Sequence, residues 1–327
     1  MERIRWGILG TGKIAGKFAE ALRMLPEAEL WAVGSRSHEK AASFASAHGF
    51  RHARAGYEAL IDDPDVDVVY VATPHVQHAA NSLLCLQAGK AVLCEKPFAL
   101  NVSEAEHVIG VARQEGLFLM EAMWMRFIPL IRRFQEMVRG GAVGEPRLLT
   151  AGFGFRADFP PEHRLFNPEL GGGALLDLGV YPLHLASMLF GEPSRIQAEA
   201  EMGTTGVDEQ NGLVLAYPGH ALAVLYSSIQ VDTPVEAVLM GTTGRIKLHH
   251  RFHHATKLTV ESGGEADVVE MPFEGNGLQF EAAEVMRCLR EGRRESDVMP
   301  LEETLRVARV LDAVRSMWGL AYPGEPP

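Results

Sequence analysis

The chain has 327 residues, 47% of them hydrophobic, which predicts about two domains that each bury a core. Its 42 acidic against 31 basic residues give a formal net charge of −11, which argues against the broad positive surface that nucleic-acid binding needs. The first residues lack a secretion signal and no later apolar run reaches membrane-spanning length, so we expect a cytoplasmic protein without a membrane partner.

The three cysteines, Cys85, Cys94 and Cys288, are odd in number and have no C-x-x-C spacing. Each of them lies in an apolar or helical stretch. We therefore expect small buried thiols in a reducing compartment rather than disulfides or zinc ligands, and no metal site.

Short β-rich runs alternate with helical patterns up to about residue 123. The expected strands cover residues 4–10, 29–35, 66–73, 91–97 and 117–123. The expected helices between them cover residues 13–25, 39–49, 76–89 and 103–116. This alternation predicts right-handed crossovers and a parallel sheet covered on both faces.

The pattern changes after one further helix at residues 128–139. Eight strand-like runs follow, at residues 148–155, 195–202, 212–218, 221–230, 235–241, 245–250, 257–262 and 267–273. They predict a largely antiparallel sheet, with two helices after it at residues 278–291 and 301–317. We therefore expect an α/β fold of two domains, residues 1–123 and 124–327.

The stretch GILGTGKIA has the pattern G-x-G-x-x-A at Gly10, Gly12 and Ala15, directly between the first expected strand and helix. Such a turn lets backbone N–H groups approach a pyrophosphate at the amino end of a helix. A glycine turn without a ligand is the alternative. The expected cofactor contacts in this turn are Gly10, Thr11, Gly12, Lys13 and Ile14.

The end of the second expected strand bears on the choice of cofactor. An acidic residue there would bind the ribose hydroxyls of NAD, but this chain has Ser35 and Arg36. A hydroxyl and a guanidinium suit the extra phosphate of NADP, so we expect NADP, with NAD as the other option. The alternative is that Arg36 is a solvated loop residue.

Ligands of open parallel sheets bind at the carboxyl ends of the strands. The strand-end residues of VATPHVQH and LCEKPFAL expected to line this crevice are Thr73, Pro74, His75, Glu95 and Lys96. Lys96 could equally be a surface lysine. His78 is a further expected cofactor contact, although a histidine at the start of a helix could simply hydrogen-bond the nearby backbone.

The stretch GGGALLDLGVYPLHLASMLF, residues 171–190, has several polar groups and glycines in an otherwise apolar helical pattern. Asp177, Tyr181 and His184 are spaced at i, i+4 and i+7, so an approximately regular helix would place them along one side. The glycines would keep the approach open, and Pro182 would remove a backbone hydrogen bond beside Tyr181. A buried polar network that specifies packing is the alternative to a catalytic stripe.

These motifs, in this order and at these separations, resemble those of the glucose-fructose oxidoreductase, inositol dehydrogenase and rhizopine catabolism family of NAD(P)-dependent oxidoreductases. The resemblance rests on GILGTGKIA, VATPHVQH, CEKP and GGGALLDLGVY and covers nearly the whole chain. EAMWMRFIP and RLFNPELGGGALLDLGVYPL are most similar to the branch of dimeric trans-dihydrodiol dehydrogenase and NADP-linked D-xylose dehydrogenase. Other branches commonly have a histidine at the position of Tyr181.

The resemblance implies a Rossmann domain followed by an α/β domain whose open sheet often forms a dimer interface, with the active site between the domains. It also implies that Lys96 and Tyr181 are catalytic and that Asp177 assists substrate binding. Hydride transfer at a hydroxyl-bearing carbon needs an acid or base for the hydroxyl proton. Tyrosine serves as that base when a nearby positive charge, here that of Lys96, favours its phenolate.

Weaker candidates for substrate contacts are Trp124, Arg126, Arg164 and His184. Packing at the domain junction is the alternative for Trp124, and a satisfied core histidine is the alternative for His184. Arg156 and Asp158 precede the glycine run and could reach the cleft, but a charged surface loop explains them equally well. The histidines of HHRFHH, residues 249–254, are not assigned to a metal, because the surrounding alternation predicts strand and turn.

We therefore expect an NADP-dependent oxidoreductase that acts on a small polyol, a sugar or a cyclic vicinal diol, or on the corresponding carbonyl compound. A dinucleotide-binding sensor or co-repressor and a cofactor-retaining glycosidase are the alternatives. The second sheet has helices for one face only, so its other apolar face predicts a homo-oligomer, either a dimer or a dimer of dimers.

Overall fold

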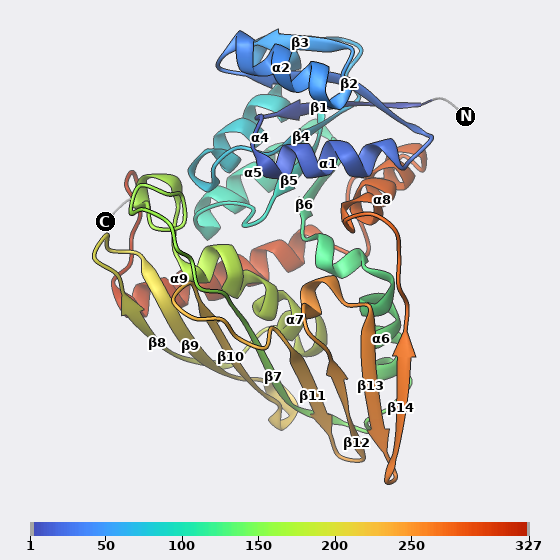
Figure 1. Cartoon of the computed structure of the whole chain (residues 1–327), viewed down its shortest axis with the longest axis vertical. Coiled ribbons are helices and arrows are strands. Elements are labelled where there is room, and N and C mark those ends of the chain that lie inside the picture. Colours follow the sequence, from blue (N-terminus) through green and yellow to red (C-terminus); the bar gives the residue numbers. More distant parts are fainter. Residues whose placement is uncertain (1–2, 326–327) are drawn as a thin grey trace. The chain divides into compact units, whose positions relative to one another are not determined.

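The computed structural model describes residues 3–325, and their contacts divide the chain into two units (Figure 1). Unit 1 extends to Trp124 and also includes Glu274–Thr304. Unit 2 comprises Met125–Phe273 and the residues from Leu305 onward. The boundary between residues 123 and 124 stays a prediction. However, residues 274–304 pack with the first unit, although they follow the second unit's strands along the chain. The sequence does not indicate this return.

Unit 1 is built on a six-stranded parallel sheet with the order β3-β2-β1-β4-β5-β6, which confirms the predicted Rossmann-type architecture. Its strands are β1 (Ile4–Leu9), β2 (Ala28–Ser35), β3 (His52–Ala55), β4 (Val68–Val71), β5 (Ala91–Glu95) and β6 (Leu119–Ala122). The order reverses beside β1, because β1 pairs with both β2 and β4. Ligands of such sheets bind at this switch point.

Helices cover both faces of this sheet. They are α1 (Lys13–Arg23), α2 (His38–His48), α3 (Glu58–Ile61), α4 (His78–Gln87), α5 (Val102–Glu115) and α8 (Leu278–Arg290). Every residue of β4, β5 and β6 is buried, as expected for strands that are covered on two sides. Under α1, the rings of Trp6, Phe18 and Tyr70 are fully buried, with 3.8 Å between the Phe18 and Tyr70 centroids.

Unit 2 is built on an eight-stranded sheet with the order β14-β13-β12-β11-β7-β10-β9-β8. Its strands are β7 (Pro146–Gly154), β8 (Arg195–Met202), β9 (Asp208–Ala216), β10 (Leu222–Ser228), β11 (Ala237–Gly241), β12 (Gly244–Leu248), β13 (Lys257–Ser262) and β14 (Glu265–Glu270). Among the strand pairs that residues 3–325 form in this sheet, only β7–β10 is parallel, so the prediction of a largely antiparallel sheet is confirmed.

Three helices belong mainly to unit 2: α6 (Pro129–Arg139), α7 (Val180–Phe190) and α9 (Leu301–Trp318). A π-helical segment, η4 (Leu175–Gly179), directly precedes α7, and both pack on β7 and β10. Along β10, buried Ala223 and Leu225 alternate with exposed Leu222 and Val224. One face of this end of the sheet is therefore covered by the helix, and the other is exposed.

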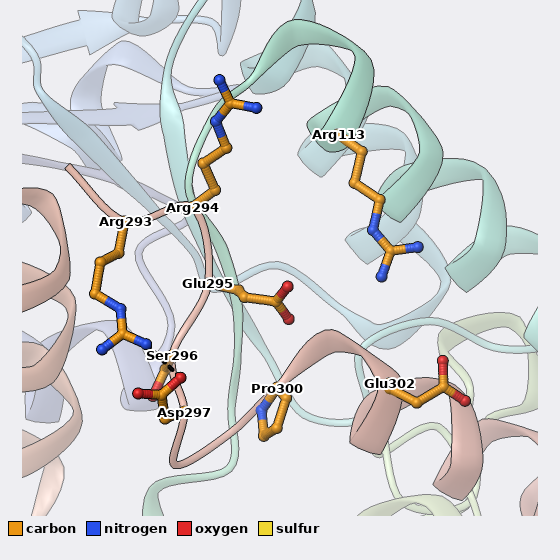
Figure 2. Close-up of a pocket in the computed structure, with 8 residues that line it drawn as sticks. All are labelled: Arg113, Arg293, Arg294, Glu295, Ser296, Asp297, Pro300 and Glu302. Carbon is orange, nitrogen blue, oxygen red and sulfur yellow. Dashed lines mark ion pairs between the residues drawn. The ribbon is translucent and has the colours of Figure 1, made fainter.

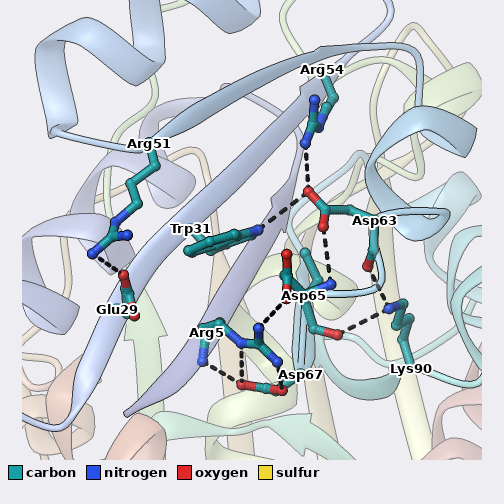
Figure 3. Close-up of polar contacts among 10 residues, drawn as sticks. Arg5, Glu29, Trp31, Arg51, Arg54, Asp63, Asp65, Asp67 and Lys90 are labelled. Carbon is teal, nitrogen blue, oxygen red and sulfur yellow. Dashed lines mark hydrogen bonds and ion pairs between the residues drawn. The ribbon is translucent and has the colours of Figure 1, made fainter.

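The amino edge of the unit 1 sheet is held by a network of charges and backbone contacts (Figure 3). Arg5 at the start of β1 donates two hydrogen bonds to Asp67 from Nε and Nη2, of 3.2 and 3.0 Å. Lys90, just before β5, donates from Nζ to the carbonyl oxygens of Asp63 and Val66 over 2.6 and 3.0 Å. These groups lie at the opposite edge from the expected cofactor residues, so we assign them to stability.

Asp63 provides a test of this assignment. Burial alone would raise the pKa of its carboxyl, but hydrogen bonds from Arg54, the Asp65 N–H and Trp31 outweigh it and lower the pKa below 3.8. Because the pKa of this carboxyl is lower in the folded than in the unfolded protein, its ionisation stabilises the fold at pH values above the ordinary pKa. That contribution is lost as the pH falls through the lowered pKa. Asp63→Asn should therefore cost about 1–3 kcal/mol of unfolding free energy at neutral pH and little at very low pH.

Urea denaturation at both pH values measures this difference. Asp65→Asn is the matched control, because the Asp65 side chain is 53% exposed and its pair with Arg5 should contribute little. Equal losses for the two variants at neutral pH would contradict the assignment.

Candidate active site

The turn after β1 has the shape of a phosphate-binding site. Gly10 has a φ of 103°, and a Cβ there would lie 2.7 Å from the Ala72 carbonyl oxygen, so only glycine fits. Gly12 is exposed at the start of α1, and no atom lies within 4 Å of the place where its Cβ would be. The first N–H groups of α1 have no partner within the helix. The residues therefore fit the pyrophosphate of a dinucleotide.

The second strand ends as the sequence predicts. Ser35 is the buried last residue of β2, and Arg36 follows it with an exposed side chain. Gly10 N donates to Gly34 O over 3.0 Å, which fixes the phosphate turn beside the end of β2. Burial is the main cause that raises the pKa of Tyr57, and the nearby charge of Arg36 opposes it. Arg36 thus presents its positive charge at the carboxyl end of β2, and its contact with a cofactor stays a prediction.

The ends of β4 and β5 bring together the other expected cofactor residues of unit 1. Thr73, Pro74 and His75 follow β4, while Glu95 ends β5 and Lys96 comes next. Because β4 and β5 are adjacent and parallel, these residues share the carboxyl edge of the sheet. Their roles in binding the cofactor stay predictions.

Glu95 fixes the backbone at Lys96. Its carboxylate accepts the Tyr70 hydroxyl at one oxygen and the Lys96 N–H at the other, the second bond being 3.0 Å long. The peptide bond between Lys96 and Pro97 is cis. The lysine therefore leaves the strand from a backbone position that a buried hydrogen-bond network determines.

Glu281 on α8 is a buried acid behind this network that the sequence analysis did not identify. It is 0% exposed. Burial, and secondly the charge of Glu95, raises the pKa of Glu281 well above its usual value. Both causes favour the protonated, uncharged form of this carboxyl. An acid on the apolar side of the pattern LQFEAAEVMRCLR was the available signal, but sequence spacing alone does not reveal that α8 packs against α1 and that Glu281 lies near Glu95.

His78 connects the two loops at this edge. Its ring contacts the Pro97 carbonyl oxygen through Nδ1 over 2.7 Å and the Thr73 carbonyl oxygen through Nε2 over 2.8 Å. The side chain is 1% exposed, and burial is the main cause that lowers its pKa. Both ring nitrogens thus contact backbone carbonyl oxygens. This is the structural role that was the alternative to a cofactor contact for His78.

A cavity of about 620 Å³ in unit 1 lies away from these residues (Figure 2). It is lined by Arg113, Arg293, Arg294, Glu295, Ser296, Asp297, Pro300 and Glu302. The Arg294 carbonyl oxygen accepts the N–H of Leu119, the first residue of β6, which places the cavity at the amino edge of the sheet. Since Arg293 pairs with Asp297 in its wall, we assign no cofactor to this cavity.

The helix that carries Tyr181 in unit 2 is not regular. Residues 175–179 form a π-helical turn, and α-helical geometry begins at Val180, so the expectation of a regular stripe is wrong for this segment. In a regular α-helix the Pro182 ring would clash with the Leu178 carbonyl group, and the wider turn relieves that clash. Asp177 and Tyr181 remain in the interior, each 6% exposed.

Asp177 is held by Arg164. The guanidinium donates from Nη1 and Nη2 to the two carboxylate oxygens over 3.0 and 3.2 Å. Asp177 is 8% exposed at its side chain and Arg164 is 53% exposed, so the pair joins the interior to the surface of unit 2. Arg164 was expected to contact substrate, and its observed contact is with the acid that the family resemblance assigns to substrate binding.

The glycines before the helix have a backbone reason. Gly171 and Gly173 have φ values of 72° and 114°, and a Cβ at Gly172 would lie 2.8 Å from the carbonyl oxygens of Arg164 and Leu165. From the sequence, we expect these glycines to keep the approach to the helix open. Close packing of residues 164–167 against them is the reason that the structure adds.

Two aromatic rings lie beside Tyr181. Phe153 at the end of β7 and His253 stack with 4.3 Å between centroids and 13° between ring planes. Their centroids lie 5.5 and 5.3 Å from that of Tyr181. The sequence does not indicate this ring stack next to the phenol, because the spacing of the histidines near residue 253 bears only on metal binding. Within residues 3–325, no group of three or more metal-ligating side chains is present.

The remaining candidates are dispersed. His184 on α7 is 0% exposed in unit 2. Trp124 and Arg126 lie in a 3-10 turn, Trp124–Phe127, where one unit ends and the other begins, and Arg126 is buried. Their substrate contacts stay predictions.

One stretch does reach membrane-spanning length and hydropathy, contrary to the sequence expectation: Pro168–Phe190. In the fold, 83% of its most apolar window is buried. Such burial is typical of the core helix of a folded unit, and the segment contains the candidate residues Asp177 and Tyr181.

Unit 1 has a parallel sheet whose strand order reverses beside β1, and a glycine turn suited to phosphate follows β1. These two features define it as a dinucleotide-binding domain. Residues 4–123 match the oxidoreductase family with NAD-binding Rossmann fold named GFO/IDH/MocA, and residues 131–247 match the GFO/IDH/MocA C-terminal domain. The chain belongs to the GFO/IDH/MocA oxidoreductase family.

Full-length relatives share this family. The chain is 38% identical to trans-1,2-dihydrobenzene-1,2-diol dehydrogenase of Bos taurus, over 98% of this chain and 99% of the relative. The enzyme of the same name from Homo sapiens is also 38% identical, with the same shares covered.

Two solved structures are similar throughout. KijD10, a 3-ketoreductase from Actinomadura kijaniata in complex with NADP and TDP-benzene, has a TM-score of 0.85 and 29% identity over 96% of this chain and 98% of that one. Aldose-aldose oxidoreductase from Caulobacter crescentus, in complex with glycerol, has a TM-score of 0.88 and 26% identity over 98% and 99%.

Proposed function

We propose that this protein is an NADP-dependent oxidoreductase that transfers hydride between the nicotinamide and a cyclic vicinal diol, a sugar or the corresponding carbonyl compound. The observation that carries the proposal is the full-length relation, at 38% identity, to dehydrogenases named for trans-1,2-dihydrobenzene-1,2-diol. The solved relatives named as a 3-ketoreductase bound to NADP and as an aldose-aldose oxidoreductase support the cofactor and the wider substrate class.

In the proposed mechanism, Tyr181 takes up or returns the proton of the substrate hydroxyl. NADP, which the glycine turn after β1 and Arg36 would hold, would accept or supply the hydride. The positive charge of Lys96 favours the phenolate and so makes the tyrosine an effective base. Asp177, oriented by two hydrogen bonds from Arg164, holds a substrate hydroxyl. The stacked rings of Phe153 and His253 pack beside the phenol and hold the Tyr181 ring in place.

A spectrophotometric screen for NADPH formation from NADP tests this function. We expect turnover with trans-1,2-dihydrobenzene-1,2-diol or with one of a set of pentoses, hexoses and inositols. Tight NADPH binding without turnover of any of them would indicate a sensor. Cleavage of a glycoside without net NADPH formation would indicate a cofactor-retaining glycosidase, so product analysis accompanies the screen.

We also propose that the protein is a cytoplasmic homodimer, or a dimer of dimers, formed through the exposed face of β9 and β10. Cys85, Cys94 and Cys288 are free and buried, as suits a reducing compartment. Val214, Leu222, Val224 and Tyr226 are 37–40% exposed. The Tyr226 ring lies across Gly152 of β7, where a Cβ would collide with it.

These exposed hydrophobic side chains are suited to packing against a second copy of the same sheet. Cross-strand pairing puts Val224 beside Val214 on the same face. A single charge at Val224 should therefore be buried without a partner in the dimer.

Val224→Asp should convert the dimer to a monomer in sedimentation experiments at micromolar concentration. Met317→Asp is the matched control. Met317 is 52% exposed on α9, so this substitution adds the same charge outside the proposed interface. A wild-type protein that sediments as a monomer at this concentration would contradict the proposal.

A further inference from the structure

A buried polar chain supports the start of the helical segment that carries Tyr181. Ser227 Oγ donates to Asn211 Oδ1 over 3.0 Å, and Asn211 Nδ2 donates to Asp208 Oδ2 over 2.7 Å. The same Asp208 oxygen accepts the backbone N–H of Leu175, the first residue of η4, over 2.8 Å. Asp208 and Ser227 are 0% exposed, and Asn211 is 4% exposed. The chain thus connects β9 and β10 to the amino end of η4.

The glycines of GGGALLDLG match this chain. At Gly173, which has a φ of 114°, a Cβ would clash with Asp208 Oδ1. At Gly179, a Cβ would lie 2.9 Å from Ser227 Oγ. The helical segment can approach the polar chain closely only because both positions lack a side chain. This fit between two separate parts of the sequence indicates that the contact is specific.

A carboxylate is well suited to the amino end of a helix, where N–H groups lack partners and the helix dipole is positive. Burial raises the pKa of Asp208 to about 7, against the hydrogen bonds from Asn211 and Leu175 and the charge of Arg315. When the acid is protonated, the proton can reside on Oδ1. Oδ2 therefore accepts both hydrogen bonds in either protonation state.

We infer that Asp208 is a positioning residue for the reaction, because its carboxyl group fixes the start of η4 and thereby the places of Asp177 and Tyr181. The inference rests on the function proposed above. Asp177 lies two residues after Leu175, and Tyr181 follows directly after the first residue of α7. A second anchor acts on the same loop, since the Tyr322 hydroxyl donates to the Gly172 carbonyl oxygen over 2.5 Å.

Two substitutions of Asp208, assayed with NADP and trans-1,2-dihydrobenzene-1,2-diol, test the inference. Asp208→Ala removes the acceptor, and we expect kcat to fall by about tenfold or more while NADPH affinity changes less than about twofold. Asp208→Asn keeps an acceptor oxygen in the same place, so kcat should stay within about threefold of wild type. This rescue by the amide would not be expected if the carboxylate acted through its charge.

Leu215→Ala in β9 is the matched control. Leu215 is 1% exposed and belongs to the same strand as Asp208. Its truncation leaves a cavity that lowers the melting temperature of the protein, and it does not touch the polar chain. It should retain kcat within about threefold. Retained kcat in Asp208→Ala, or an Asp208→Asn protein as slow as Asp208→Ala, would overturn the inference.

If Asp208→Ala does not fold, Asn211→Ala replaces it, because Asn211 orients the acceptor oxygen. We then expect kcat to fall by roughly threefold to tenfold with unchanged NADPH affinity, and an unchanged kcat would overturn the inference. Wild-type protein and Tyr181→Phe, measured in parallel, separate the two proposals. A wild-type protein without turnover would refute the proposed function itself, whereas an inactive Tyr181→Phe beside a fully active Asp208→Ala would refute only the positioning role.

Discussion

Replacing Tyr181 with phenylalanine should lower kcat by about 100-fold or more and leave NADPH affinity nearly unchanged. The substitution removes the hydroxyl that carries the proton and keeps the ring that packs against Phe153 and His253. NADPH affinity should be retained because the phosphate turn belongs to unit 1 and Tyr181 belongs to unit 2. Steady-state kinetics and cofactor titration measure the two quantities.

Lys96→Met should give a comparable loss, because the tyrosine is a poor base without a nearby positive charge. If each residue acts through the other, the double variant should lose much less activity than the product of the two single losses. Independent, multiplying losses would contradict the proposed cooperation of these residues.

Tyr217→Phe is the control for Tyr181→Phe. Tyr217 is 5% exposed, and its ring lies 5.0 Å from that of Phe190 at the far end of α7. The control makes the same chemical change on a buried tyrosine of the same unit, and its turnover should stay near that of wild type. If Tyr181 belonged only to a structural network, Tyr181→Phe would lower the melting temperature while the folded protein kept its turnover.

The fold was largely predictable because its periodicity is local. Alternating strands and helices in the first part of the chain, and the eight later strand-like runs, all appear where the patterns place them. The short strand β3, with the sequence HARA, was not identified, because four residues of mixed polarity carry no clear period. The return of α8 to unit 1 also has no local signal, since an amphipathic pattern does not specify the partner of its apolar side.

The candidate site was predictable where a motif fixes the backbone and less so where packing does. Gly10, Ser35 and Lys96 lie at strand ends as their positions along the chain indicate. The π-helical turn at residues 175–179 was not predicted, because the spacing argument assumed a regular helix. Sequence spacing also does not reveal that Arg164 pairs with Asp177 or that His253 stacks on Phe153. Such contacts depend on how distant strands and loops pack.

The preference for NADP should depend on Arg36. Arg36→Ala is expected to weaken NADPH binding by about 1.5–3 kcal/mol, because a charge-assisted contact with the ribose phosphate is lost. NADH lacks this phosphate, so its affinity should hardly change. The variant should therefore bind the two cofactors with similar affinity. Fluorescence transfer from tryptophan to the reduced nicotinamide, titrated with each cofactor, measures both affinities.

Arg51→Ala is the matched control, because it removes one exposed arginine from the same unit with the same change in net charge. Arg51 pairs with Glu29 near the start of β2, whereas Arg36 follows the end of that strand at the cofactor edge. A general effect of net charge would weaken NADPH binding equally in both variants, but a direct phosphate contact would be lost only in Arg36→Ala. Equal wild-type affinities for NADPH and NADH, unchanged by Arg36→Ala, would refute the assignment of Arg36 to the phosphate.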